Sequence, residues 1–259
     1  MMVLITTAAT SVESGAAGEK PCLRLTVLFD NVSHRPGLVP GWGFSCLVEV
    51  PGKTILFDTG ADGGTLLANM KRLGVNPDGI AAVFLSHIHG DHTGGLGALL
   101  ARRPGIQVFL PEGFPASFRR AVTERGADVR TVGAGGRLAD HVTGTGGLSK
   151  DGIVEQSLIV ETPQGLVVVT GCAHPGIARI VETAERLTGK KSHLLLGGFH
   201  LGGASRTGIQ AIVARLRSLG VRKVAPSHCT GEAATALFRQ AWGHDFVEAG
   251  LGAVIVVPL

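Results

Sequence analysis

A dense group of histidines directly after an apolar segment is the feature that most constrains this chain. The segment SHIHGDHTGG places His87, His89, Asp91 and His92 within six residues. The apolar run Ala81–Leu85 before it has the length and composition of a buried strand. Imidazole and carboxylate groups are the usual ligands of zinc and related divalent ions. A solvated polar loop is the alternative, but this density of ligands favours a metal site at a strand end.

Similar polar motifs follow other apolar segments of the chain. ILFDTG carries Asp58, and the downstream motifs GCAHPG, GGFHL and SHCTG carry His174, His200 and His228. The glycines beside these residues allow sharp turns and a close approach of the backbone to an ion or a ligand. We therefore expect several strand-end loops to converge on one centre.

The motif HxHxDH resembles the metal-binding motif of the metallo-β-lactamase superfamily, and the similarity comprises five motifs in order, this one included, between about Leu25 and the C-terminus. The set is similar to the branch of dihydropterin–ribofuranosylaminobenzene phosphate synthase-like metal-dependent hydrolases. This resemblance implies an α/β fold of the αββα type, in which two mixed sheets face each other with helices outside. It also implies one or two divalent metal ions, with zinc expected and manganese or iron as alternatives.

The resemblance further implies a ligand set. His87 and His89 would bind the first metal together with a third histidine from elsewhere in the chain. Asp91, His92 and His228 would bind the second metal. A histidine of the core that hydrogen-bonds to the backbone is the alternative for His228.

The chain departs from the superfamily pattern downstream. Many relatives carry a metal-bridging Asp where Cys172 stands here, and we expect His174, two residues later, to supply the third imidazole. Glu155 is an alternative source of a carboxylate. Asp58 and Cys172 are expected to support the ligands without binding metal. We expect His200 to contact the substrate or transfer a proton, with metal ligation and a buried structural role as alternatives.

A divalent ion lowers the pKa of bound water from about 15.7 towards about 7, and Asp91 can orient that water and shuttle its proton. The main hypothesis is therefore hydrolysis of an anionic phosphoester, ester or amide by metal-activated hydroxide, with Asp91 and His200 as catalytic residues. The resemblance adds a pterin-type synthase, a transferase that condenses a methyl diphosphate with an aminobenzene phosphate. A metal-dependent binding or sensor protein without turnover is the third hypothesis.

Charge and composition limit the classes of molecule that the chain is expected to bind. The net charge of +4 and the pI near 9.1 favour an anionic small-molecule substrate. The chain has no dense Lys/Arg run of the kind that indicates nucleic-acid binding. A homo-oligomer and a monomer are both compatible with the sequence. If the substrate carries a planar pterin, Trp42, Phe44 and Phe199 are the candidates for stacking on it, with core packing as the alternative.

The 259 residues, 44% of them hydrophobic, suffice for a large core. We expect a single domain over residues 22–259 after a flexible tail, residues 1–21, which lacks the positive start of a secretory signal. The four cysteines form no Cys-x-x-Cys pair, so free thiols and a cytoplasmic location are expected. No apolar run reaches about 18 residues, which predicts no membrane-spanning helix.

Hydrophobic periodicity predicts strands and helices in alternation. The segment 133–152, with seven glycines, is expected to be the least ordered and to form either a mobile flap or a long surface loop. Strands are expected over 23–29, 44–50, 53–57, 81–85, 107–110, 157–161, 166–170, 194–196, 221–225 and 254–257, and helices over 65–73, 95–103, 115–125, 177–187, 207–219 and 232–242.

Overall fold

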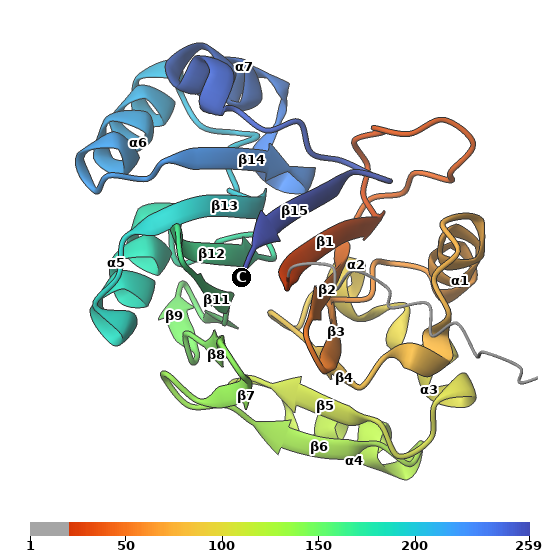
Figure 1. The fold of residues 1–259 in the computed structure, drawn as a ribbon. Helices are drawn as coiled ribbons and strands as arrows, with labels where there is room; N and C mark the ends of the chain where they lie inside the picture. The colour runs from red at the N-terminus through yellow and green to blue at the C-terminus, as the bar shows by residue number, and fades with distance from the viewer. Residues whose placement is uncertain (1–20) are drawn as a thin grey trace, which may run out of the picture.

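Two β-sheets face each other and carry helices on their outer surfaces in the computed structural model (Figure 1), which describes residues 21–259. The predicted αββα sandwich is confirmed. Residues 1–20, which make up most of the expected tail, lie outside the described residues.

The first sheet has the strand order β15-β1-β2-β3-β4-β5-β6. Its pairs from β15 to β3 are antiparallel, and those from β3 to β6 are parallel. The tight Pro51-Gly52 turn, with Gly52 at φ 76°, joins β2 to β3. The strands are β1 (Cys22–Phe29), β2 (Ser45–Val50), β3 (Lys53–Phe57), β4 (Ala82–Phe84), β5 (Gln107–Leu110), β6 (Asp128–Thr131) and β15 (Val254–Pro258).

The second sheet has the order β14-β13-β12-β11-β8-β7. Strands β12, β13 and β14 run parallel, whereas β11, β8 and β7 pair antiparallel. The strands are β7 (Arg137–Ala139), β8 (Val142–Gly144), β11 (Leu158–Thr162), β12 (Gly165–Thr170), β13 (Ser192–Gly198) and β14 (Lys223–Ser227); β9 (Leu148–Lys150) and β10 (Ile153–Glu155) form a separate hairpin.

Helices cover both outer faces of the sandwich. Buried side chains of α1, α3 and α4 pack on the first sheet, and those of α5, α6 and α7 pack on the second. The helices are α1 (Gly63–Arg72), α2 (Gly90–Thr93), α3 (Leu96–Arg102), α4 (Ala116–Glu124), α5 (Ile177–Thr188), α6 (Arg206–Ser218) and α7 (Glu232–Trp242), with 3-10 turns η1 (Pro77–Gly79), η2 (His228–Thr230) and η3 (Gly243–Asp245).

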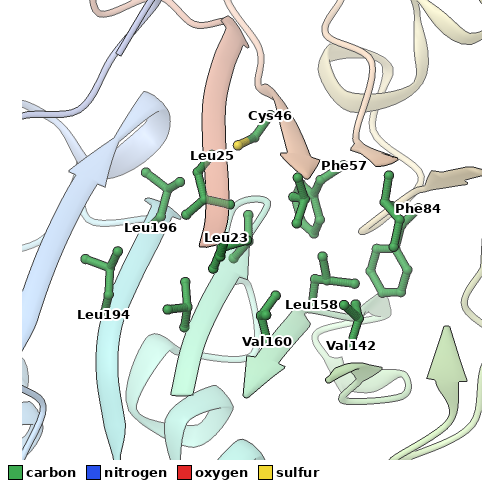
Figure 2. Packing of buried hydrophobic residues seen from close by; sticks show 14 of the residues in the cluster. Leu23, Leu25, Cys46, Phe57, Phe84, Val142, Leu158, Val160, Leu194 and Leu196 are labelled. Atoms are coloured by element: carbon green, nitrogen blue, oxygen red, sulfur yellow. The ribbon is translucent and has the colours of Figure 1, made fainter. Parts of the chain in front are cut away.

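The central core lies between the sheets (Figure 2). Strand β1 shows why, because Leu23, Leu25 and Val27 alternate along it and all lie in the cluster that both sheets share. Leu194 and Leu196 of β13 belong to the same cluster. Burial of these apolar faces fixes the spacing of the two sheets and thereby the relative positions of their strand ends.

The expectation for residues 133–152 was wrong, because β7, β8 and β9 lie within this segment. Some of its glycines serve close packing: a Cβ on Gly144 would lie 3.0 Å from the Val132 side chain, and one on Gly147 would lie 2.7 Å from Val154. Strand β6 was not predicted, since it is a partly exposed edge strand with a polar sequence. No helix within residues 21–259 is both long and apolar enough to cross a membrane.

Candidate metal centre

Five strand ends carry the predicted site residues. Asp58 follows β3, the HxHxDH motif follows β4, and the loops after β12, β13 and β14 carry the downstream histidines. Asp58, Ala173, His200 and His228 all have positive φ, between 50° and 60°. Non-glycine residues adopt this conformation at an energetic cost and do so most often at functional sites. Four of the six non-glycine residues with positive φ within residues 21–259 thus lie at these strand ends, which supports their assignment as the candidate centre.

The predicted ligands form two groups at this edge. The first group contains His87, His89 and His174, each with one potential ligand atom within 4.8 Å of the others. The second group contains Asp91, His92, Cys172 and His228 under the same distance criterion. The structure thus brings together all six residues predicted to bind metal, in the same two groups that the resemblance implies. Ligation itself stays a prediction.

Four of the imidazoles are oriented by an oxygen acceptor at Nδ1. His92 donates to Asp58 Oδ2 (2.7 Å), and His174 donates to Glu155 Oε2 (2.9 Å). His228 donates to Asn31 Oδ1 (2.8 Å). The hydroxyl of Ser86 donates to Asp58 and accepts from His87 Nδ1 (2.8 Å). A proton on Nδ1 leaves the Nε2 lone pair of each ring free, which is the arrangement that positions histidine for a metal.

One candidate ligand atom has no hydrogen-bond partner within residues 21–259. The Nε2 atom of His228 is buried and accepts no hydrogen bond within residues 21–259, although Asp91 Oδ2 lies 3.4 Å away. A buried polar atom without a partner is costly and requires an explanation. A divalent ion between His228, Asp91 and His92 would supply the missing interaction, so the residues present fit a metal ion.

The carboxylate of Glu155 is not placed as a metal ligand. Its oxygens accept hydrogen bonds from the backbone N–H groups of Cys172, Ala173 and His174, at 2.8–3.0 Å, and from His174 Nδ1. Glu155 therefore holds the loop that presents His174. The alternative that it replaces the missing bridging Asp is wrong in this arrangement, because both oxygens are already engaged.

Cys172 lies among the ligands instead of behind them. Its Sγ is 3.3 Å from His92 Nε2 and belongs to the second ligand group. The supporting role predicted for Cys172 therefore gives way to a candidate role as a fourth donor. The preceding Gly171 makes this approach feasible, because a Cβ there would lie 2.2 Å from Ser86 Oγ and 3.1 Å from Asp58 Oδ2.

His200 lies at the exposed side of the centre, with its ring centroid 4.5 Å from that of His174. It groups with Cys172 and His174 as a candidate donor set. Its exposure excludes the alternative of a buried structural histidine. A hydrogen bond with the Cys229 thiol raises the pKa of His200 above its ordinary value. The structure thus leaves proton transfer, substrate contact and ligation open for His200.

Two of the three candidates for aromatic stacking belong to the core. Phe44 and Phe199 are at most 1% exposed, and Phe199 packs on Phe238 with ring centroids 5.3 Å apart. Trp42 differs, because its side chain is largely exposed and its ring lies 5.0 Å from that of His228. Core packing is therefore the role of Phe44 and Phe199, and only Trp42 can reach a ligand.

The protonation states of Asp91 and His87 suit a bound cation. Burial alone would raise the pKa of Asp91, but the adjacent imidazoles of His228 and His92 hold it well below its ordinary value. Burial lowers the pKa of His87 well below its ordinary value, and the neighbouring His92 lowers it further. A neutral His87 and an ionised Asp91 at neutral pH are the protonation states that metal binding requires.

We expect Asp58→Asn to lower metal affinity by about 10–100-fold. Asp58 accepts hydrogen bonds from Ser86 N, Ser86 Oγ and His92 Nδ1, and a single amide oxygen cannot serve all three donors. Competition with a chromogenic chelator measures the affinity. Asp140→Asn, on an exposed residue paired with Arg137, is the matched control. Equal affinity in Asp58→Asn and wild type would contradict this role.

Sequence reasoning missed the residues that hold the ligands from a distance. Asn31 accepts from His228 Nδ1, and its amide donates to the His228 carbonyl oxygen (3.3 Å), although 197 positions separate the two residues. Asp30 is hydrogen-bonded to the Ser227 hydroxyl just before His228. Neither residue belongs to a recognisable motif. Only the polar Asp-Asn pair at the end of an apolar strand signals them.

Comparison with known proteins agrees with this geometry. A sequence model described as the Metallo-beta-lactamase superfamily matches residues 40–228. A protein of Methanocaldococcus jannaschii named 7,8-dihydropterin-6-methyl-4-(beta-D-ribofuranosyl)-aminobenzene-5'-phosphate synthase is 30% identical over 270 aligned positions, which cover 83% of this chain and 91% of the synthase.

Two solved structures share the fold. Tm1679, described as a metal-dependent hydrolase of the beta-lactamase superfamily, superposes with a TM-score of 0.76 at 28% identity and covers 91% of this chain and 99% of its own. The short form of human tRNase Z has a TM-score of 0.61 at 15% identity, over 91% of this chain and all of its own. The second likeness concerns the fold alone.

Proposed function

Because this chain belongs to the metallo-beta-lactamase superfamily, we propose that it is a two-metal enzyme of the pterin synthase type. It would join an amine-bearing aminobenzene phosphate to a pterin methyl diphosphate. The observation that carries the proposal is the pair of adjacent ligand groups, one of three histidines and one with Asp91 and Cys172. The 30% identity to the named synthase over 83% of the chain supports this choice of reaction.

In the proposed reaction, the amine nitrogen forms a bond to the methylene carbon, the C–O bond to the diphosphate breaks, and the amine loses a proton. Divalent ions, with zinc expected, would supply positive charge to the anionic oxygens of the leaving diphosphate. His200 is suited to accept the proton of the amine, because it is an exposed imidazole beside the first ligand group.

Diphosphate release in the presence of one or both substrates tests the proposal. Metal-loaded protein is mixed with 6-hydroxymethyl-7,8-dihydropterin diphosphate, with and without the ribofuranosylaminobenzene phosphate. We expect diphosphate only when both are present, together with a coupled product of the summed mass minus diphosphate. Release at the same rate without the amine, or none at all from fully loaded protein, would overturn the synthase proposal.

Hydrolysis of an anionic phosphoester, ester or amide is the second candidate. The likeness to the structure described as a metal-dependent hydrolase, at 28% identity, favours it. The same charge on the metals would then act on a single substrate in water. Turnover of one substrate, abolished by a chelator and restored by zinc, is the outcome that distinguishes hydrolysis from the two-substrate reaction.

We further propose that Cys172 binds the second metal as a thiolate in place of a bridging carboxylate. Sulfur ligands favour zinc over harder ions. Protein loaded with Co²⁺ should show an intense near-ultraviolet absorption band from sulfur-to-cobalt charge transfer. Cys172→Ser is expected to lose this band, and Cys46→Ser, on a buried thiol in the sandwich core, should retain it. A band that is unchanged in Cys172→Ser would exclude ligation by this thiol.

A further inference from the structure

The loop between β1 and β2, residues 30–44, leaves apolar side chains exposed, and one of them, Trp42, lies beside the candidate metal centre. Trp42 is 60% exposed, Val32 41% and Val39 40%. They are three of the six large apolar residues that are exposed within residues 21–259. Exposed apolar groups gathered near a polar centre are typical of ligand-binding surfaces.

The backbone on either side of Trp42 is hydrogen-bonded, on one side within its own loop and on the other side to the HxHxDH motif. The Gly41 N–H donates to the Asp30 carbonyl oxygen (3.1 Å), and the Phe44 N–H donates to the Asp91 carbonyl oxygen (3.2 Å). Gly43 has φ 141°, and a Cβ on it would lie only 2.3 Å from the same Asp91 oxygen. The backbone that carries the indole is therefore held in place, although the side chain itself is not packed into the core.

Trp42 contacts His228, which lines a cavity that could accept a ligand. Its ring centroid is 5.0 Å from that of His228, with the two planes tilted by 54°. His228 in turn lines a groove of about 510 Å³, to which Val32 of the same loop and residues of α7 also contribute. Ligand sites of small molecules fall in the range of about 300–1,000 Å³.

We propose that Trp42 determines specificity by stacking its indole on a planar aromatic ring of the substrate. The inference rests on the proposed function for the anionic part of that substrate, which the metal centre would hold. A tryptophan offers a large, flat apolar surface on a side chain with few rotatable bonds, so it binds a planar ring at a small entropic cost. The arrangement explains why the loop keeps its largest apolar side chain in solvent next to His228.

Binding of 6-carboxypterin, a flat bicyclic ring with a carboxylate, tests this inference by calorimetry on the metal-loaded protein. Trp42→Ala should raise the Kd about tenfold, as expected for the loss of one aromatic stacking contact. Trp42→Phe keeps a ring and should stay within about threefold of wild type. Val256→Ala, on the exposed edge strand β15, is the control and should bind like wild type.

An unchanged Kd in Trp42→Ala, a loss in Trp42→Phe equal to that in Trp42→Ala, or no binding to wild type at millimolar probe would each overturn the inference. Metal content, measured by elemental analysis, should be the same in all four proteins, because Trp42 offers no metal ligand. If 6-carboxypterin does not bind while metal-dependent turnover persists, the role of Trp42 falls and the proposed function stands. If Trp42→Ala weakens binding but neither reaction occurs, the proposed function falls instead.

Discussion

Asp91→Asn is expected to lower turnover by about 1,000-fold or more and to remove the second metal ion. Asp91 Oδ2 lies 3.5 Å from His92 Nε2 and 3.4 Å from His228 Nε2, and it is the only carboxylate in the second ligand group. A neutral amide cannot offset the charge of a divalent ion or take up a proton. Elemental analysis should show the metal content falling from about two equivalents to about one.

The Asp140→Asn variant is the control for Asp91→Asn as well, since it makes the same chemical change on an exposed residue far from the ligand groups. It should keep wild-type metal content and rate. Retention of two equivalents of metal in Asp91→Asn would remove this carboxylate from the ligand set. Full turnover in that variant would remove it from the chemistry as well.

Glu155→Ala is expected to lower the free energy of unfolding of the metal-free protein by about 3–5 kcal/mol. The Glu155 side chain is fully buried, and its loss leaves the N–H groups of residues 172–174 and His174 Nδ1 without their acceptor. Urea unfolding measures the change. Glu161→Ala, which removes an exposed ion pair with Lys190, should cost less than about 1 kcal/mol.

The same residue sets an acid dependence of stability. Burial alone would raise the pKa of Glu155, but hydrogen bonds from His174 and the backbone hold it below the ordinary value of 4.5. A pKa that is lower in the folded state than in the unfolded chain gives stability that is present above about pH 4.5 and is lost as the pH falls through the folded-state pKa. Glu155→Gln should flatten this part of the acid unfolding curve. A curve with the wild-type slope would show that Glu155 does not contribute.

The local parts of the site could be predicted from the sequence. His87 and His89 lie on the loop after the buried strand β4, and Asp91 and His92 lie on the short helix α2 that follows, so their proximity follows from chain connectivity. Apolar segments of strand length, which alternate with segments of helical periodicity, predicted most strands of the two sheets. Polar edge strands such as β6 were missed because they carry no apolar pattern.

The pairing of distant loops was decided by the tertiary structure. The sequence could suggest that His174 and His228 join the motif. Only the packing of the two sheets brings the loops after β12 and β14 next to the loop after β4. For the same reason, Glu155 and Cys172 differ from their predicted roles. Glu155 holds the loop of His174, and Cys172 lies among the candidate ligands. Whether a buried carboxylate or thiol faces a metal site or a row of backbone N–H groups depends on the loops packed against it.

The sequence by itself thus determined which residue types form the candidate metal centre, because the types of ligand and their spacing along the chain are local properties. The tertiary structure decided which groups orient each imidazole, since acceptors such as Asn31 reach their histidine across 197 positions. The packing of the two sheets brings such distant groups together. Their hydrogen bonds therefore cannot be inferred from the spacing of residues along the chain. The exposure of Trp42 beside His228 is likewise a property of the packed molecule alone.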